Sequence, residues 1–241
     1  MTTILKKIHQ RIYLISVGFF FLVMYPAFYF YSRKQERYKT LNKWRSALSF
    51  LTSASVGILY RYHYQTKIDW SKPYILCPNH SSNLDISALT ILAKGEFAFI
   101  GKDELLSNPL TGLFFRTIDI SFNRDSKIGA YRAFKKGEEY LKNGMSLIIF
   151  PEGKISTDYP PVLHEFKNGP FRLAIEQQIP IIPVSIKKLW EIMWDDGKKH
   201  GSQPGICHIC VHRPIETTGM VVAQADELRD KVFGIINQET S

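Results

Sequence analysis

A histidine and an aspartate that could do acid–base chemistry follow the apolar run at residues 74–77. Residues 79–85 read Asn-His-Ser-Ser-Asn-Leu-Asp, so His80 and Asp85 are five residues apart. On one ideal helix their side chains would point about 140° apart and could not meet. They can meet if His80 lies in the turn before a helix and Asp85 in its first turn. The carboxylate would then fix the imidazole tautomer, leaving the other ring nitrogen to take a proton from a hydroxyl group.

The same residues also fit a simpler interpretation, a helix-capping turn. Ser81, Ser82 or Asn83 could each be the N-cap residue, and an aspartate is favoured near a helix N-terminus by the helix dipole. Residue types alone leave both interpretations open, the base with its orienting acid and the capping turn.

A second group of candidate residues follows another apolar run, at residues 147–149. Glu152, Gly153 and Lys154 place a carboxylate, a flexible glycine and a cation directly after that run. Three further cations lie just past predicted strands or in loops near them, namely Lys102, Arg124 and Lys167. Several cations at one opening would suit a phosphate group, although each taken singly could be an ordinary surface charge.

After residue 70, the elements that must position these residues alternate between short apolar runs and longer amphipathic ones. The predicted strands are 74–77, 97–100, 118–122, 146–150, 181–186 and 206–211, and the predicted helices are 85–93, 126–143, 170–177 and 223–236. Buried strands separated by helices indicate an α/β fold with a mostly parallel central sheet and helices on both faces. Sites in such sheets form beyond the carboxyl ends of strands, which is where both groups of candidate residues fall.

The N-terminal segment has a different character. Residues 12–32 contain no charged residue, and 21 helical residues can cross a hydrocarbon layer of roughly 30 Å. Pro26, the aromatic-rich end of the run and its basic flanks fit an interfacial or re-entrant hairpin equally well. Residues 41–62 have the spacing of an amphipathic return helix. A signal peptide and a buried core helix are disfavoured, because no cleavage site follows and few elements could cover the run. We expect a membrane-anchoring helical segment at 1–65 and a second domain at 66–241.

The net charge of +9 is concentrated in this segment. Nine of the 31 Lys and Arg residues, but only one of the 22 Asp and Glu residues, fall within residues 1–45. The nearly neutral remainder argues against nucleic acid as a partner, whereas the basic flanks suit an anionic membrane surface. Three cysteines, an odd number, fit a reducing compartment. The expected location is therefore the cytoplasmic face of the inner (plasma) membrane.

Other chemistries lack their sequence motifs. The chain contains no G-x-S-x-G nucleophile elbow, no Walker A motif and no Rossmann glycine pattern. Cys207 and Cys210 would point to opposite faces of a strand and cannot close on one metal ion. His208, Cys210 and His212 could share a face, but ordinary strand packing is the better interpretation.

Together these segments resemble the glycerolipid acyltransferase family, in particular the 1-acylglycerol-3-phosphate (lysophosphatidic acid) acyltransferases. The resemblance covers about residues 70–190, as four blocks in the family's order. The His-x4-Asp block is complete at Asn79, His80, Ser82 and Asp85. The second block resembles Lys102, Glu104, Leu105, Pro109, Gly112 and Arg124. The third is Phe-Pro-Glu-Gly-Lys-Ile-Ser at 150–156, with Ile155 where the family commonly has arginine, and the fourth resembles Ile182, Pro183 and Val184.

The resemblance implies a glycerol-3-phosphate acyltransferase-like fold and a particular reaction. A fatty acyl group would pass from a thioester, on acyl carrier protein or coenzyme A, to the sn-2 hydroxyl of a membrane lipid acceptor, 1-acylglycerol-3-phosphate, giving phosphatidic acid. His80 would be the general base and Asp85 its orienter. The residues implied in binding the glycerophosphate or shaping its pocket are Lys102, Arg124, Glu152, Gly153, Lys154, Ser156, Lys167 and Pro183.

The resemblance implies no metal and no cofactor, because the thioester is a co-substrate. Two alternatives stay open. One is an acyltransferase with another acceptor, such as glycerol-3-phosphate or a lyso-aminolipid. The other is a non-catalytic basic protein that binds membrane lipids.

Overall fold

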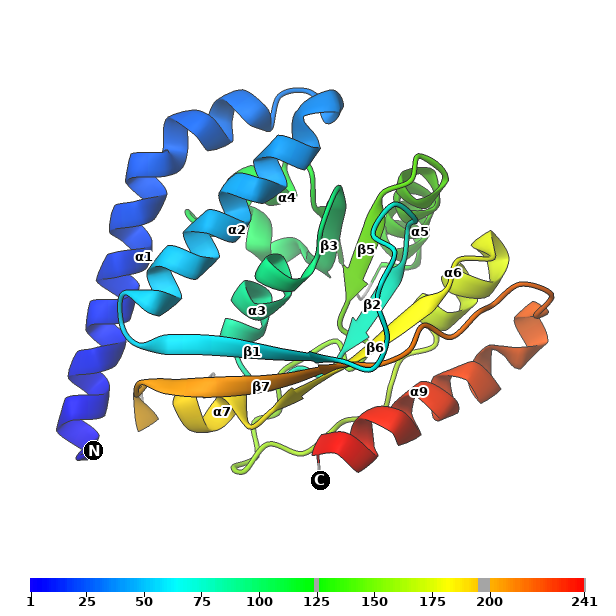
Figure 1. Cartoon of the computed structure of the whole chain (residues 1–241). Coiled ribbons are helices and arrows are strands. Elements are labelled where there is room, and N and C mark those ends of the chain that lie inside the picture. The colour runs from blue at the N-terminus through cyan, green and yellow to red at the C-terminus, as the bar shows by residue number, and fades with distance from the viewer. Residues whose placement is uncertain (124–125, 195–199, 241) are drawn as a thin grey trace.

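The computed structural model describes residues 1–123, 126–194 and 200–240, which form a seven-stranded sheet with helices on both faces (Figure 1). The strands are β1 (Ile58–Tyr64), β2 (Ile75–Pro78), β3 (Phe97–Lys102), β4 (Ile120–Phe122), β5 (Ser146–Ile149), β6 (Ile181–Lys187) and β7 (Gly205–Val211). The longer helices are α1 (Thr3–Tyr31), α2 (Tyr38–Ala54), α3 (Leu84–Leu92), α5 (Lys127–Lys142), α6 (Gly169–Gln177) and α9 (Ala225–Thr240). Shorter turns of helix are α4 (Gly112–Phe115), α7 (Leu189–Ile192), η1 (Gln35–Arg37), η2 (Asp103–Leu106) and η3 (Val222–Gln224).

The sheet is mostly parallel, as the sequence predicts. Its strand order is β1-β7-β6-β2-β5-β3-β4. Strands β6, β2, β5, β3 and β4 run parallel to their neighbours, whereas β7 is antiparallel to β6 and parallel to β1. The five parallel strands therefore end at one edge of the sheet, which we call the carboxyl edge. Residues that follow β2, β5 and β3 come together there, although they lie far apart in the chain.

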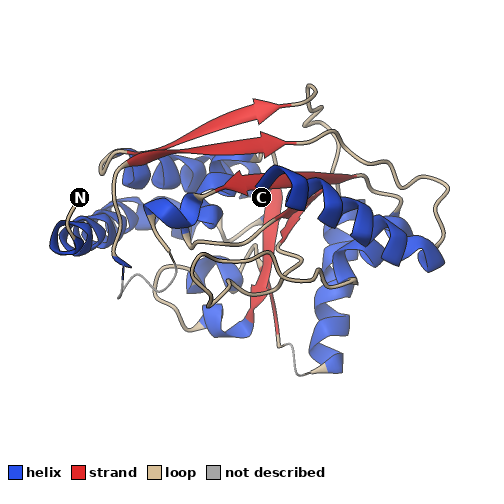
Figure 2. Cartoon of the chain, turned by 90° about the horizontal axis from the view of Figure 1, so that it is seen from below, coloured by secondary structure: helices blue, strands red, loops and turns tan. Residues whose placement is uncertain are grey.

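Alternate residues of the central strands enter two separate cores. Ile75 and Leu147 pack with side chains from α5, α6 and α9 on one face. Leu76 and Ile148 pack with side chains from α3 and α7 on the other. Figure 2 shows helices on both sides of these strands. Burial on both faces explains why the central strands read as short, almost continuous apolar runs.

Strand β1 corrects one sequence prediction. The return helix predicted at 41–62 is α2, which ends at Ala54, and residues 58–64 form an edge strand paired with β7 along its whole length. Tyr60 and Tyr62 point toward the helices, where their hydroxyls bond Ser53 Oγ (3.1 Å) and the Ala88 carbonyl (2.8 Å). Alternating aromatic residues are typical of a half-buried strand. Strand β1 lies before the predicted boundary at residue 65, yet it belongs to the sheet.

Helices α1 and α2 form the predicted N-terminal hairpin and run side by side along one side of the molecule (Figure 1). Contacts near the start, middle and end of α1 hold it to the rest of the chain: His9 Nδ1 to Ser202 Oγ (2.7 Å), Ser16 Oγ to Ser55 Oγ (2.7 Å), and the Phe28 ring to the Phe114 ring (5.3 Å between centroids). Much of its remaining apolar surface is open, with Ile15 70% and Leu22 72% exposed. Helix α1 is long and apolar enough to cross a membrane and is the one such helix among the described residues.

A buried ion pair fixes α2 to the sheet. Arg45 Nη2 lies 2.8 Å from Asp119 Oδ2, and both side chains are buried. The other Asp119 oxygen accepts the main-chain N–H of Phe99 (2.9 Å), while Arg45 also donates to Asn42 Oδ1 (3.1 Å). Burial raises the pKa of Asp119, and the neighbouring guanidinium opposes that rise. Each charge therefore depends on the other for its compensation.

Replacing Asp119 by alanine is expected to lower the free energy of unfolding by about 3–5 kcal/mol, because Arg45 would stay buried without its partner. Chemical denaturation of the protein in detergent micelles measures this loss. The matched control is Glu138→Ala, which removes the ion pairs of Glu138 with the exposed Lys135 and Lys142 on the surface of α5 and should change stability little. Similar losses in the two variants would contradict the assignment.

Candidate active site

His80 and Asp85 meet in the arrangement that the sequence predicts. His80 lies between the end of β2 and the start of α3, and Asp85 lies in the first turn of α3. His80 Nδ1 is 2.9 Å from Asp85 Oδ2. A carboxylate oxygen can only accept a hydrogen bond, so Nδ1 carries the proton and donates it. The Nε2 nitrogen is then the one with a free lone pair, as a general base requires.

Asp85 also binds the main chain of the turn before α3. Its Oδ2 accepts the main-chain N–H groups of Ser81 (2.7 Å) and Ser82 (2.9 Å) as well as the His80 proton. Asp85 is fully buried. Three donors on one oxygen compensate the charged carboxylate for its loss of water and leave it little freedom to turn. The N-cap residue of α3 is Asn83, one of the three candidates that the sequence left open.

The side chains of Asn79 and Ser82 hold the His80 turn to other elements. The Asn79 amide donates to the Ile186 carbonyl (3.0 Å) and accepts the Ile186 N–H (2.7 Å), which ties the end of β2 to β6. The Ser82 hydroxyl donates to the Met193 carbonyl, beyond α7. The turn is therefore fixed from two sides before any ligand is bound.

Glu152 makes main-chain contacts that its predicted role did not include. It was expected to bind the glycerophosphate, but both oxygens accept main-chain N–H groups, Oε1 from His80 (2.6 Å) and Oε2 from His164 (2.8 Å). Only 4% of the residue is exposed. Burial raises the pKa of Glu152 to about 7, while the two N–H donors act in the opposite direction. Glu152 therefore holds the His80 main chain in place, and both of its oxygens are occupied by main-chain donors.

The residues around Glu152 shape the same turn. The ring of Phe150 stacks on His80, with 3.8 Å between centroids, and limits the ring from one side. Gly153 has a φ of +72°, a conformation that favours glycine, and turns the chain directly after Glu152. Ser156 was expected to bind the ligand, but its hydroxyl is buried and accepts the N–H of Asp158 (3.2 Å).

Three of the four predicted cations, Lys102, Lys154 and Lys167, lie along the carboxyl edge. Lys154, just after Gly153, and Lys167 are both exposed. The main-chain N–H of Lys167 donates to the Pro151 carbonyl (2.8 Å), and this hydrogen bond closes the loop 151–167. Lys102 ends β3, so strand β5 separates it from the end of β2 that carries His80. Arg124 lies outside the described residues. The described cations at this edge are therefore lysines, and Ile155 stands at the position of the motif arginine.

Pro183 lies within the sheet rather than at its edge. It is buried in β6, pairs with Cys77 of β2, and its carbonyl accepts the N–H of His212 (3.1 Å). Its partner Cys77 comes three residues before His80, so Pro183 lies deeper in the sheet than the His80 turn. Pro183 therefore supports the floor of the site from the sheet.

The cysteine and histidine residues of β7 pack as ordinary strand residues. The buried His212 has its Nε2 2.8 Å from Ser185 Oγ on β6. Within residues 1–123, 126–194 and 200–240, no three His, Cys, Asp or Glu side chains are grouped so as to hold a metal ion. Cys77, Cys207 and Cys210 are free and buried.

Comparisons with known proteins bear on the same region. The family model described as Acyltransferase matches residues 60–187, more than half of the 241-residue chain, and this range contains His80, Asp85 and Glu152. A 1-acyl-sn-glycerol-3-phosphate acyltransferase of Saccharomyces cerevisiae is 31% identical over 164 residues, covering 67% of this chain and 53% of that protein. A human 1-acyl-sn-glycerol-3-phosphate acyltransferase alpha is 25% identical over 202 residues, covering 83% of this chain and 69% of that protein.

A solved structure shares the whole fold. The crystal structure of the 1-acyl-sn-glycerophosphate acyltransferase from Thermotoga maritima matches with a TM-score of 0.77 at 23% identity, covering 97% of this chain and 95% of that one. The match therefore extends over the N-terminal hairpin as well as the sheet.

The raised pKa of Glu152 predicts a pH dependence of stability that Glu152→Gln should remove. Between about pH 4.5 and about 7 the unfolded carboxyl loses its proton while the folded one keeps it. Stability should therefore fall by about 3 kcal/mol as pH rises through this window, relative to the variant. Urea denaturation of both proteins from pH 4 to 8 gives the difference curve.

The matched control for this series is Glu165→Gln, an exposed carboxylate on the same loop, which should keep the wild-type slope. A difference curve between wild type and Glu152→Gln that is flat, or that rises with pH, would contradict the assignment.

Proposed function

The chain belongs to the acyltransferase family, and from this membership we propose that it transfers a fatty acyl group from a thioester to the sn-2 hydroxyl of 1-acylglycerol-3-phosphate, giving phosphatidic acid. The observation that carries the proposal is the His80–Asp85 pair, which leaves Nε2 ready to take a proton from an alcohol. The names of the relatives from Saccharomyces cerevisiae and human support this acceptor. The donor would be acyl carrier protein or coenzyme A carrying the acyl group.

The proposed reaction is a direct transfer. The acceptor oxygen attacks the thioester carbonyl as His80 Nε2 takes the hydroxyl proton, and Asp85 stabilises the imidazolium that forms. The tetrahedral intermediate then expels the thiolate, which receives the proton from His80. General base catalysis of this kind contributes about 10²- to 10⁴-fold, and positioning of the two substrates supplies much of the remainder.

The lysines at the carboxyl edge are the proposed phosphate ligands. Lys154 and Lys167 flank the loop that Glu152 anchors, and Lys102 ends a nearby strand. A lysine binds phosphate as a point charge, without the paired contacts of an arginine. The uncharged Ile155 favours a second candidate function, transfer to an acceptor with another headgroup, such as glycerol-3-phosphate or a lyso-aminolipid.

The N-terminal hairpin supports a membrane-bound acceptor. A lysophospholipid stays in the bilayer, since a charged headgroup cannot be drawn far from the interface cheaply. Helix α1 contacts the rest of the chain from Lys6 to Phe28, so it lies along the domain. We infer that α1 lies in the plane of the membrane interface, with its exposed apolar surface in the acyl layer and its basic flanks on anionic headgroups, on the cytoplasmic face of the inner membrane.

The test is acyl transfer by the purified chain in phospholipid vesicles. Labelled acyl-coenzyme A or acyl carrier protein is supplied with 1-acylglycerol-3-phosphate, glycerol-3-phosphate or a lyso-aminolipid, and the products are identified by mass spectrometry. Phosphatidic acid should form, and His80→Ala should lower the rate at least about 100-fold, because the general base is lost.

Folding and vesicle binding of His80→Ala serve as controls and should match the wild type. A folded, vesicle-bound wild-type protein that acylates none of these acceptors would overturn the proposal. Equal rates for His80→Ala and wild type would remove His80 from the mechanism.

A further inference from the structure

Four aromatic rings gather beside the loop that follows Glu152. Tyr159 comes from this loop, and the others come from α7 and the segment after it. The Tyr159 ring lies parallel to His200, with 4.3 Å between centroids, edge-on to Trp190 at 5.4 Å, and tilted against Trp194 at 5.1 Å. We call these four residues the aromatic cluster. Tyrosine and tryptophan combine a large apolar ring with a polar tip, which suits them to a boundary between water and lipid.

Part of the cluster and its neighbours is open to the surroundings. Tyr159 is 52% exposed, and Val162, three residues further along the same loop, is 55% exposed. Lys154 at the start of the loop is exposed, as are Asp158 and Lys188, and Lys188 Nζ lies 3.7 Å from a Glu191 carboxylate oxygen. Apolar side chains bordered by lysines form the kind of surface that anionic headgroups attract.

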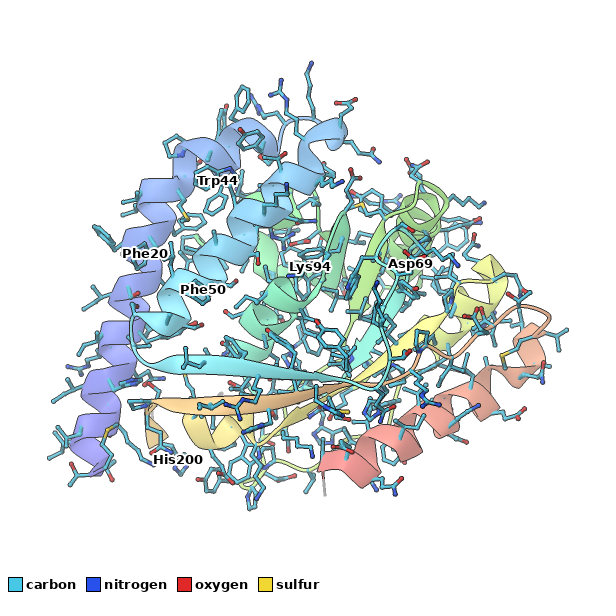
Figure 3. All side chains as sticks on the ribbon, in the orientation of Figure 1. Phe20, Trp44, Phe50, Asp69, Lys94 and His200 are labelled. Atoms are coloured by element: carbon cyan, nitrogen blue, oxygen red, sulfur yellow. The ribbon has the colours of Figure 1, made fainter. Side chains whose placement is uncertain are left out.

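The cluster is continuous with the start of α1. Gly201, directly after His200, packs so closely on α1 that an added Cβ would lie 2.5 Å from the main chain of Lys6. The next residue, Ser202, donates its N–H to the Lys6 carbonyl (2.9 Å) and contacts His9 through its hydroxyl (2.7 Å). Figure 3 shows His200 at the end of the molecule where α1 begins. The residues Ile4, Leu5 and Ile8 lie in the same part of α1 as Lys6 and are exposed.

The same two segments hold the His80 turn. Trp194 follows Met193, whose carbonyl accepts the Ser82 hydroxyl. The loop that carries Tyr159 begins at Glu152, whose carboxylate accepts the His80 N–H. The position of the cluster relative to a bilayer would thus fix the depth of the His80 ring.

We propose that the aromatic cluster, together with Val162, is a second membrane contact that rests among phospholipid headgroups while α1 lies in the interface. The inference rests on the proposed membrane-bound acceptor. A single helix in the interface leaves a protein free to roll about the helix axis, whereas a second contact away from that axis stops the roll. The two contacts together would hold the carboxyl edge at headgroup depth.

A single fluorescent label tests this contact. The three native cysteines are buried, so a cysteine introduced at an exposed position can be labelled selectively. Val162→Cys places a polarity-sensitive fluorophore on the proposed contact. Val221→Cys is the matched control, because Val221 is 60% exposed and precedes α9 on the opposite side of the molecule from α1 (Figure 1).

The labelled chains are bound to vesicles of phosphatidylcholine and phosphatidylglycerol, without acyl donor. The label at position 162 should shift its emission to the blue and be quenched by lipids that carry a quencher at the headgroup, while the label at position 221 should do neither. A label at 162 that keeps its aqueous emission on vesicle-bound protein overturns the proposal.

A second variant measures the contribution of the ring itself. Tyr159→Ala should lower the vesicle partition coefficient about fivefold, through loss of buried apolar area, whereas Tyr131→Ala, at an exposed tyrosine of α5, should leave it unchanged. Equal effects of the two substitutions contradict the proposal.

These readouts do not depend on chemistry. A label that enters the bilayer in a protein without acyl transfer activity supports the contact and counts only against the proposed function. Normal acyl transfer with an aqueous label at position 162 counts only against the contact.

Discussion

The hydrogen bond from His80 Nδ1 to Asp85 Oδ2 is the interaction on which the rest of this structure depends. A fully buried carboxylate is costly unless donors compensate it, and here the His80 ring and two main-chain N–H groups do so. The charge in turn fixes the imidazole tautomer. Asn79 and Glu152 then tie this turn to β6 and to the loop after β5. The fold can therefore be understood as a frame around one oriented ring.

The sheet topology explains how the frame is assembled. Strands β2, β5 and β6 are neighbours and end at the same edge, although long helical connections separate them in the chain. Because β7 is antiparallel to β6, β7 begins at this same edge. Ser202, just before β7, donates its N–H to the Lys6 carbonyl of α1 there. The N-terminal hairpin and the His80 turn are thus linked through Met193 and Ser202, which pair with each other. A membrane held by α1 would act on the site through these contacts.

Local features of the site could be predicted from the sequence, and long-range ones could not. The His80–Asp85 contact lies within one turn, so residue types and the apolar run before them offered it as one of two interpretations, and the second group of residues and the family resemblance favoured it. Strand β1 was missed because residues 58–64 continue the helical spacing of the residues before them. Their conformation is set instead by pairing with β7, about 150 residues later in the chain. The main-chain contacts of Glu152 could not be predicted for a similar reason. The adjacency of β2 and β5 brings the His80 N–H within reach, and the path of the loop after β5 brings the His164 N–H.

The most direct test of the account is the single-turnover rate of acyl transfer by Asp85→Asn. An amide cannot supply the charge that orients and stabilises the protonated ring, so the chemical step should slow by about 10²- to 10⁴-fold while acceptor binding changes little. The exposed Asp158, replaced in the same way, should leave the rate unchanged. A folded Asp85→Asn protein that transfers acyl groups at the wild-type rate would contradict the central claim.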